Sequence, residues 1–246
     1  MKFGFGKSLL FGSLVTGLLS WGLISPALAL PEAEVMEKLR SVPVFTVTDA
    51  EGAPLVVNDD RQNERAVAGV FISQDDANAF LERLKRDNPD LGNQVQVTAV
   101  SLGAVYQLGQ ENRDRADGLS FAFVPIDEQV KSAETLIRQG GQEIEEFRGV
   151  PLFVARAGND QRYLTLQQGD RQMVPFFFEQ EQLQTMVDAF KQQNPELATT
   201  VKVMVVNLEG VIETLRNSEN QQLNQILLVP SQESMEFLRS LPGEDQ

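Results

Sequence analysis

Apolar positions along this chain follow two periods, and both periods return in the same order in its two halves. Runs rich in β-branched and aromatic residues at 42–47, 55–57 and 65–72 predict three strands. After Ser73, apolar residues recur three and four positions apart, which predicts a helix with one apolar face formed by Ala77, Phe80, Leu81 and Leu84. The pattern indicates a sheet covered by an amphipathic helix.

This helix has recognisable ends. Ser73 can cap its N-terminus, and Lys85 and Arg86 lie in its last turn, where the helix dipole favours positive charge. Asn88-Pro89 then ends it.

Two further strands are expected at 94–100 and 119–124, each followed by a helix. Ser101 caps the first of these helices, and Pro125 precedes the second. The first half of the chain is therefore predicted to run β-β-β-α-β-α-β-α.

The second half repeats the first almost segment by segment. VPVF at 42–45 returns as VPLF at 150–153, and KRDNPDL at 85–91 returns as KQQNPEL at 191–197, so that the offset drifts only between 108 and 105. This period is longer than the ~20–50 residues of a solenoid repeat. It predicts two half-domains that share one core across a pseudo-two-fold axis.

The fold class that follows is α/β (α+β), with two tandem repeats of β-β-β-α-β-α-β-α and sheets flanked by helices. We expect a signal peptide at 1–29, a first half at 30–139, a linker at 140–149 and a second half at 150–246, with both halves in one globular body.

Three residues predict interruptions in the sheets. Pro43 cannot donate to a ladder, so we expect its strand at an edge. Gly69 aligns with Pro175 in the repeat, and both weaken a strand, which predicts a bulge or an unpaired edge at the same point of each half.

The first 29 residues are typical of an export signal. Lys2 and Lys7 precede an apolar run from Leu9 to Ile24, and Ala27-Leu28-Ala29 matches a signal-peptidase site. The run is shorter than the ~18–20 residues that span a bilayer, although an uncleaved anchor is the alternative. We expect an exported protein in the periplasm or the thylakoid lumen, without a membrane span.

Composition narrows the chemistry. The chain has neither cysteine nor histidine, which removes disulfides, thiolate chemistry and the commonest general base and zinc ligand. After loss of the two leader lysines, 19 basic residues face 35 acidic ones, a net charge of −16. Nucleic acid is therefore an improbable partner, and the charge is accounted for by solubility.

Candidate catalytic and metal-binding residues are few. Residues 112–118 resemble an EF-hand loop, but Ala116 stands where a ligand belongs. Asp59-Asp60 and Asp75-Asp76 are adjacent carboxylates, whose side chains point apart in a strand or helix. We predict no cofactor, no metal and no enzymatic activity; a hydrolase using Asp/Glu pairs is the remaining catalytic alternative.

The apolar residues, unlike the charged ones, suggest a candidate binding site. Phe176 and Phe178 share one face of a predicted strand, and Phe177 takes the other. If helices cover both faces, all three belong to the core. If one face is partly open, an aromatic groove for an apolar segment of another chain results, formed by Phe71, Phe80, Leu84, Phe176, Phe177, Phe178, Met186 and Phe190.

Four segments carry a family resemblance: SVPVFTVT at 41–48, AVAGVFISQDDA at 66–77, DNPDL at 87–91 and VTAVSLGAVY at 97–106. They are similar to the 22-kilodalton Tic subunit family, the intermembrane-space components of chloroplast protein import and their cyanobacterial relatives. A bacterial-type signal peptide indicates a cyanobacterial member. The resemblance implies a chaperone-like role for unfolded precursor or outer-membrane proteins, alongside the β-barrel assembly machinery, and apolar pockets on two sides of the body.

Two functions follow from this comparison. The first is a chaperone that binds clients in apolar grooves, or by strand addition at an open sheet edge, and so assists translocation and outer-membrane biogenesis. The alternative is a non-catalytic adaptor that docks to a β-barrel assembly or translocon membrane complex.

Overall fold

The computed structural model describes residues 32–58, 66–115, 118–217 and 221–241. The predicted signal peptide, the Asp59-Asp60 pair and residues 116–117 of the EF-hand-like loop lie outside these ranges. The first half contains α1 (Glu32–Arg40), β1 (Pro43–Thr48), β2 (Val56–Asn58), β3 (Ala66–Phe71), α2 (Gln74–Asp87), α3 (Pro89–Gly92), β4 (Gln96–Ser101), α4 (Leu102–Asn112), β5 (Ser120–Val124) and α5 (Asp127–Gln139).

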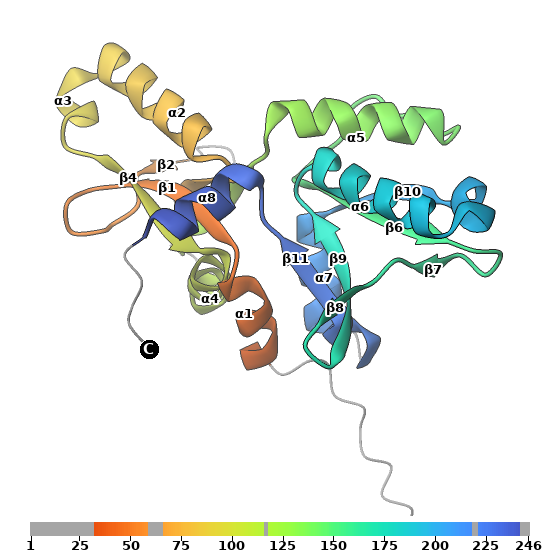
Figure 1. Ribbon diagram of the computed structural model, residues 1–246. Coiled ribbons are helices and arrows are strands. Elements are labelled where there is room, and N and C mark those ends of the chain that lie inside the picture. The colour runs from red at the N-terminus through yellow and green to blue at the C-terminus, as the bar shows by residue number, and fades with distance from the viewer. Residues whose placement is uncertain (1–31, 59–65, 116–117, 218–220, 242–246) are drawn as a thin grey trace, which may run out of the picture.

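From β6 on, the second half follows the order that the first half has from β1 on, with small additions and without a counterpart of α1. It contains β6 (Pro151–Ala157), β7 (Arg162–Tyr163), β8 (Leu166–Gln168), β9 (Arg171–Phe177), α6 (Gln180–Gln193), η1 (Pro195–Thr200), β10 (Lys202–Asn207), α7 (Leu208–Asn217), η2 (Gln221–Gln225), β11 (Ile226–Val229) and α8 (Gln232–Ser240). The result is a mixed α/β architecture of two sheets flanked by helices (Figure 1).

The helix caps form as expected from the sequence. The Ser73 hydroxyl accepts a hydrogen bond from the Asp76 N–H at 3.2 Å, and the Ser101 hydroxyl accepts one from the Ala104 N–H at 3.1 Å. Each cap satisfies a backbone donor that the first helical turn would otherwise leave unpaired.

The two sheets pair their strands in matching registers. In the first sheet β1 lies between β3 and β4, while β3 pairs with β5 in parallel; in the second, β6 lies between β9 and β10, while β9 pairs with β11 in parallel. Phe45 faces Phe71 where β1 meets β3, and Phe153 faces Phe177 where β6 meets β9.

The expected edge position of Pro43 is wrong. β1 is flanked on both sides, by β3 and by β4. Pro43 is tolerated because it is the first residue of the strand, where its missing N–H removes no interior ladder bond.

The expected interruption at Gly69 and Pro175 is confirmed as a gap in one ladder. Gly69 pairs with Ala122 on one side, and on the other it lies between the β2 pairing and the single β1 pair. There the Thr46 hydroxyl donates to the Gly69 carbonyl at 2.9 Å. Pro175 pairs with Leu227 and lies in the same position between β8 and β6.

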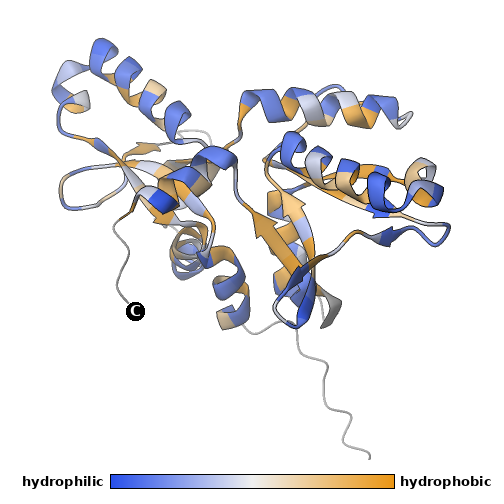
Figure 2. Ribbon diagram, in the orientation of Figure 1, coloured by the Kyte–Doolittle hydropathy of each residue, from blue (hydrophilic) through white to orange (hydrophobic). Residues whose placement is uncertain are grey.

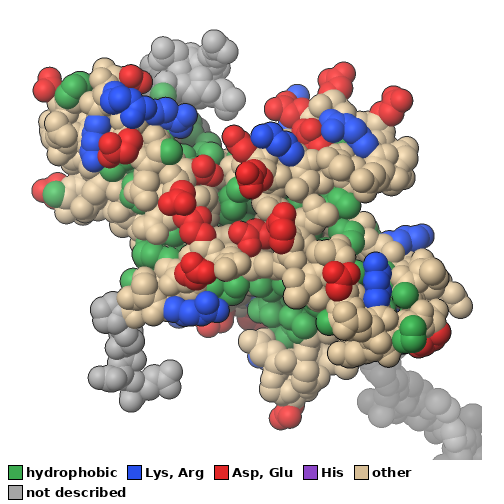
Figure 3. Space-filling view, turned by 45° about the horizontal axis from the view of Figure 1, so that its top comes forward, with side chains coloured by type: hydrophobic (Ala, Val, Ile, Leu, Met, Phe, Trp, Pro, Cys, Tyr) green, Lys and Arg blue, Asp and Glu red, His purple; other side chains and the backbone are tan. Residues whose placement is uncertain are grey.

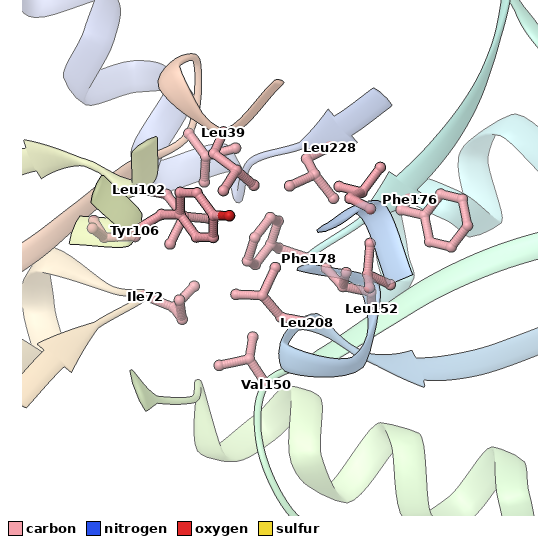
Figure 4. Close-up of a cluster of buried hydrophobic side chains, with 14 of the residues drawn as sticks. Leu39, Ile72, Leu102, Tyr106, Val150, Leu152, Phe176, Phe178, Leu208 and Leu228 are labelled. Carbon is pink, nitrogen blue, oxygen red and sulfur yellow. The ribbon is translucent and has the colours of Figure 1, made fainter. Parts of the chain in front are cut away.

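Buried side chains form three clusters. The largest contains residues of both sheets together with α1, α4 and α7, and includes Leu39, Leu102, Leu152, Phe178 and Leu208 (Figure 4). Because both halves contribute to it, we call it the shared core. The two smaller clusters lie on the outer faces of the sheets, around Phe45 and around Phe153.

The last helix of each half packs on the sheet of the other half. Helix α5 packs on β6 and β10 of the second sheet, where Ala133 is fully buried. Helix α8 packs on β1 of the first sheet, where the Phe237 ring meets the Phe45 ring edge-on at 5.4 Å. Figure 2 shows apolar residues along the strands and hydrophilic residues on the outer sides of the helices.

Candidate functional site

The residues predicted to form the groove divide by depth. The rings of Phe71, Phe176, Phe177 and Phe178 are buried, whereas Phe80, Leu84, Met186 and Phe190 on α2 and α6 are half-buried. The strand alternation is as expected, because Phe176 and Phe178 join the shared core and Phe177 joins the outer cluster around Phe153. The four phenylalanines therefore belong to the buried core, and only the half-buried residues of α2 and α6 can contact a ligand.

Met186 and Phe190 lie in a pocket of about 650 Å³ between α6 and the segment that carries β7 and β8. We call it the outer groove. Tyr163 and Leu166, which are 39% and 36% exposed, form its opposite wall. Its other apolar lining residues are Ala157, Leu164, Ala189 and Leu197. An apolar side chain of another molecule can enter this groove without displacing the core.

Aromatic and charged contacts hold the wall of the outer groove. The Arg156 guanidinium lies 4.1 Å from the centre of the Tyr163 ring and donates a hydrogen bond to the Tyr163 hydroxyl. The same ring packs against Phe176, with 6.3 Å between centroids. Arg162 and Asp160 form an exposed ion pair at the rim. The wall is thus tied to the shared core and carries both signs of charge at its edge.

Sequence reasoning missed this wall. The strands β7 and β8 have only two and three residues, and their burial does not alternate. The sequence clue to a two-stranded excursion was the pair Gly158 and Gly169, both of which adopt positive φ and bound the segment.

In the first half, Phe80 and Leu84 occupy the positions on α2 that match Met186 and Phe190 on α6. The Phe80 ring packs on Phe71 with 5.4 Å between centroids. The residues that match Tyr163 and Leu166 are Pro54 and Val57, because Thr48 pairs with Pro54 as Arg156 pairs with Tyr163, and Val57 pairs with Val67 as Leu166 pairs with Met173.

Carboxylates gather where α2, α5, α6 and α8 begin, along the middle of the face in Figure 3. Burial raises the pKa of Asp76, and the nearby Asp127, Glu233 and Asp75 raise it further. Burial also raises the pKa of Glu179, although the hydrogen bond from the Gln232 N–H opposes this shift. The carboxylates at the start of these four helices therefore repel anionic partners.

The described residues hold no group of three or more histidine, cysteine, aspartate or glutamate side chains arranged for a metal ion. Of the two pairs of adjacent carboxylates, Asp75 and Asp76 lie in the first turn of α2. None of the helices in the described part of the chain is long and apolar enough to cross a membrane.

The structure thus defines an α/β protein of two helix-flanked sheets, which share one core, exchange their last helices and leave an apolar outer groove beside α6. The chain belongs to the Tic22-like family, whose model matches residues 16–240. Members of this family are non-catalytic, in agreement with the expectation of a chain without enzymatic activity.

Known relatives are similar over most of the chain. Two Arabidopsis thaliana proteins, TIC 22-like and TIC 22, both chloroplastic, are 25% and 24% identical over 80% and 84% of it. These matches span 60% and 70% of the relatives' own lengths. The structure of Anabaena Tic22, described as a protein-transport protein, is 34% identical, with a TM-score of 0.78 over 88% of this chain and 100% of that one.

A more distant structure shares the fold. Tic22 from Plasmodium falciparum is 21% identical, with a TM-score of 0.61 over 83% of this chain and 95% of that one.

Proposed function

We propose that this protein is a chaperone-like component of protein transport that holds apolar segments of unfolded precursor or outer-membrane proteins in the outer groove. The observation that carries the proposal is the half-buried pair Met186 and Phe190 facing the exposed Tyr163 and Leu166 across an open pocket, in a chain of the Tic22-like family. Methionine and aromatic side chains suit varied clients, because methionine adapts its shape and aromatic rings bury a large area.

The expected affinity is modest. A large apolar side chain contributes about 1.5–3 kcal/mol when fully buried, and association costs offset much of what two or three anchors provide. Such binding releases clients readily, which suits an escort that passes a chain onward.

The leader and the family together support the place of action. An exported cyanobacterial Tic22-like protein would work in the periplasm or the thylakoid lumen and deliver clients to the β-barrel assembly machinery. The matching strand registers support a further part of this proposal: the two halves are copies of one unit, related by a pseudo-two-fold axis through the shared core.

The test uses the mature chain from Leu30 and a chemically denatured outer-membrane protein diluted into buffer. We expect the wild-type chain to suppress light scattering by the client, and the variants Tyr163→Ser and Leu166→Ser to suppress it several-fold less. Leu166 is exposed and belongs to none of the buried clusters, so Leu166→Ser leaves the core intact, whereas Tyr163→Ser also removes the contact of Tyr163 with Phe176. Phe190→Ser is the stronger but riskier variant, because Phe190 also packs on the cluster around Phe153.

Gln184→Ser is the matched control, because Gln184 is an exposed residue of α6 that does not line the outer groove. Thermal unfolding establishes that each variant is folded. Folded groove variants that protect the client as well as wild type would rule out the outer groove as the binding site.

The family membership also supports a second function, a passive adaptor docked to one folded membrane complex. An adaptor gives a single stoichiometric partner in cross-linking and does not protect the denatured client. The same two measurements therefore separate the alternatives.

A further inference from the structure

Strand β4 forms a free edge of the first sheet. It pairs with β1 along its whole length, and among the described strands none pairs with its other side. The Leu102 N–H donates to the Val42 carbonyl at 2.8 Å, just beyond the end of β4, and this bond fixes the alternation of the antiparallel ladder. The backbone N–H and C=O groups of Val97 and Ala99 therefore point away from β1, toward the free edge.

This edge lacks the features that prevent strand pairing. Proteins protect a free edge with charged side chains, with proline or with a bulge. Strand β4 reads QVTAVS, without charge or proline, and its register with β1 is unbroken. Ala99, near the middle of the strand, has a small and exposed side chain. The edge can therefore accept an added strand.

An apolar pocket of about 230 Å³ lies beside this edge, between β4 and α8. Ala99 lies opposite Phe45, on the face of the sheet where α8 packs. Phe237, Leu238 and Leu241 line the pocket from the side of α8. Leu238 and Leu241 are 43% and 46% exposed, although both are large and apolar. A strand added along β4 would place every second side chain on this face, and the side chain opposite Ala99 would enter the pocket.

The matching position in the second sheet is filled. Strand β10 pairs with β6 in the register in which β4 pairs with β1, so that Val205 takes the place of Ala99. The larger Val205 packs on the cluster around Phe153, as does Leu136 of α5, the counterpart of α8. The pocket beside β4 therefore depends on the small side chain of Ala99.

We propose that β4 binds an extended segment of another polypeptide by strand addition, with one large apolar side chain of that segment in the pocket beside α8. The outward groups of Val97 and Ala99 supply backbone hydrogen bonds, and the pocket selects the side chain, which is how strand addition combines affinity with specificity. The contact requires an alternating apolar pattern in the partner and no particular sequence. This inference does not rest on the function proposed for the outer groove, because neither β4 nor α8 lines that groove.

A second copy of this chain is a poor occupant of the edge. Without its leader, the chain has 19 basic residues against 35 acidic ones, so two copies repel each other. The contact along β4 is one strand wide and six residues long, whereas a stable dimer buries about 800 Å² per partner. A neutral or basic extended segment avoids the repulsion, and a small contact suits a partner that is bound and then released.

The test adds a short fluorescent peptide of alternating leucine and threonine, with a lysine at each end, to the mature chain from Leu30. Fluorescence anisotropy should show saturable binding. Amide hydrogen exchange at Val97 and Ala99, followed by NMR, should slow in the complex, because both N–H groups gain acceptors. A peptide of the same composition with its leucines in one block should bind about tenfold more weakly, since it cannot place them on one face.

Two variants of the protein act on the edge and on the pocket separately. Ala99→Lys places a charge on the edge, and Leu238→Ser removes an apolar wall of the pocket. Both side chains are exposed, so both variants should fold. Ala99→Lys should weaken peptide binding about tenfold and Leu238→Ser several-fold. The outer-groove variant Leu166→Ser is the control and should leave binding unchanged.

Four outcomes would overturn the proposal. The first is the absence of saturable binding. The second is unchanged exchange at Val97 and Ala99 in the complex, which would place the peptide elsewhere. The third is loss of binding in Leu166→Ser, which would place the peptide in the outer groove. The fourth is dimerisation of the wild-type chain that Ala99→Lys abolishes, which would make a second copy the occupant.

Discussion

At the scale of single residues, burial and neighbouring carboxylates disfavour the ionised form of Asp76, an acidic residue in the first turn of a helix. Asp76 lies in the first turn of α2 beside Asp75 and near Asp127 and Glu233, which come from helices α5 and α8. Burial and these neighbours raise its pKa, so the folded state binds its proton more tightly than the unfolded chain does. The stability that this shift provides is present below the unfolded pKa and is lost as the pH rises through the folded one.

We therefore expect Asp76→Asn to raise the free energy of unfolding at pH 7, by less than about 1 kcal/mol, since the carboxylate is partly screened by solvent. The gain should shrink as the pH falls below the unfolded pKa of about 3.9, because the wild-type aspartate then becomes protonated in both states. Urea unfolding at several pH values measures both. Glu51→Gln, in an exposed turn, is the control. A gain that does not change with pH would show that charge is not the cause.

At the scale of elements, the exchanged helices cap the helices on which they sit. Gln129 of α5 accepts a hydrogen bond from the Gln180 N–H at 2.9 Å and donates one to the Glu181 carboxylate at 3.0 Å. In the other half Glu233 of α8 accepts a hydrogen bond from the Asp75 N–H at 2.8 Å. A helix leaves its first backbone donors unpaired, and here the neighbouring half supplies the acceptors.

Replacing Gln129 by alanine should destabilise the chain by about 1–2 kcal/mol, because the residue is buried and two hydrogen bonds are lost. Denaturant unfolding measures the loss. Gln184→Ala removes an exposed hydrogen bond to Asp188 within α6 and should change stability by less than about 0.5 kcal/mol. Equal losses in the two variants would mean that the cap between halves contributes nothing.

At the scale of the whole molecule, the shared core and the exchanged helices join the two halves into one unit. Phe178 shows this connection. It directly follows β9 in the second half, and it lies in the same buried cluster as Leu39 and Leu102 of the first half (Figure 4). If the inner face of one sheet became exposed to solvent, the inner face of the other sheet would be exposed as well. We infer that the halves unfold together.

Phe178→Ala should cost about 3–5 kcal/mol, the range for a buried phenylalanine replaced by alanine. Amide hydrogen exchange should then quicken in β1 as well as in β6, because both strands pack on the shared core. Val57→Ala, at a position that is 68% exposed, should alter neither strand. Faster exchange confined to the second sheet would contradict the coupling of the halves.

Local features of the fold could be predicted from local sequence. Apolar periodicity predicted the longer strands and helices of the two halves but not α1, β7 or β8, and Ser73 and Ser101 cap the helices they were expected to cap. The gap at Gly69 and Pro175 was predictable, because glycine and proline act on their own backbone wherever the chain lies. Pro43 was misplaced because the position of a strand in a sheet depends on distant partners, here β3 and β4.

The candidate site was only partly within reach of the sequence. Met186 and Phe190 were expected at a groove and line one, but the wall of Tyr163 and Leu166 lies on strands too short to show a period. Burial separated the remaining candidates, since Phe176 and Phe178 lie in the shared core with residues of the first half, whereas Phe80 and Leu84 are half-buried.

By itself, the sequence determined the elements that the two halves share, their order, and the absence of cysteine and histidine chemistry, because these depend on neighbouring residues and on composition. Tertiary structure alone decided that α5 packs on the second sheet and α8 on the first, and that α1 packs against α4, α7 and β11. These arrangements arise from packing between residues about a hundred positions apart, and no local pattern encodes which of two similar surfaces a helix will cover.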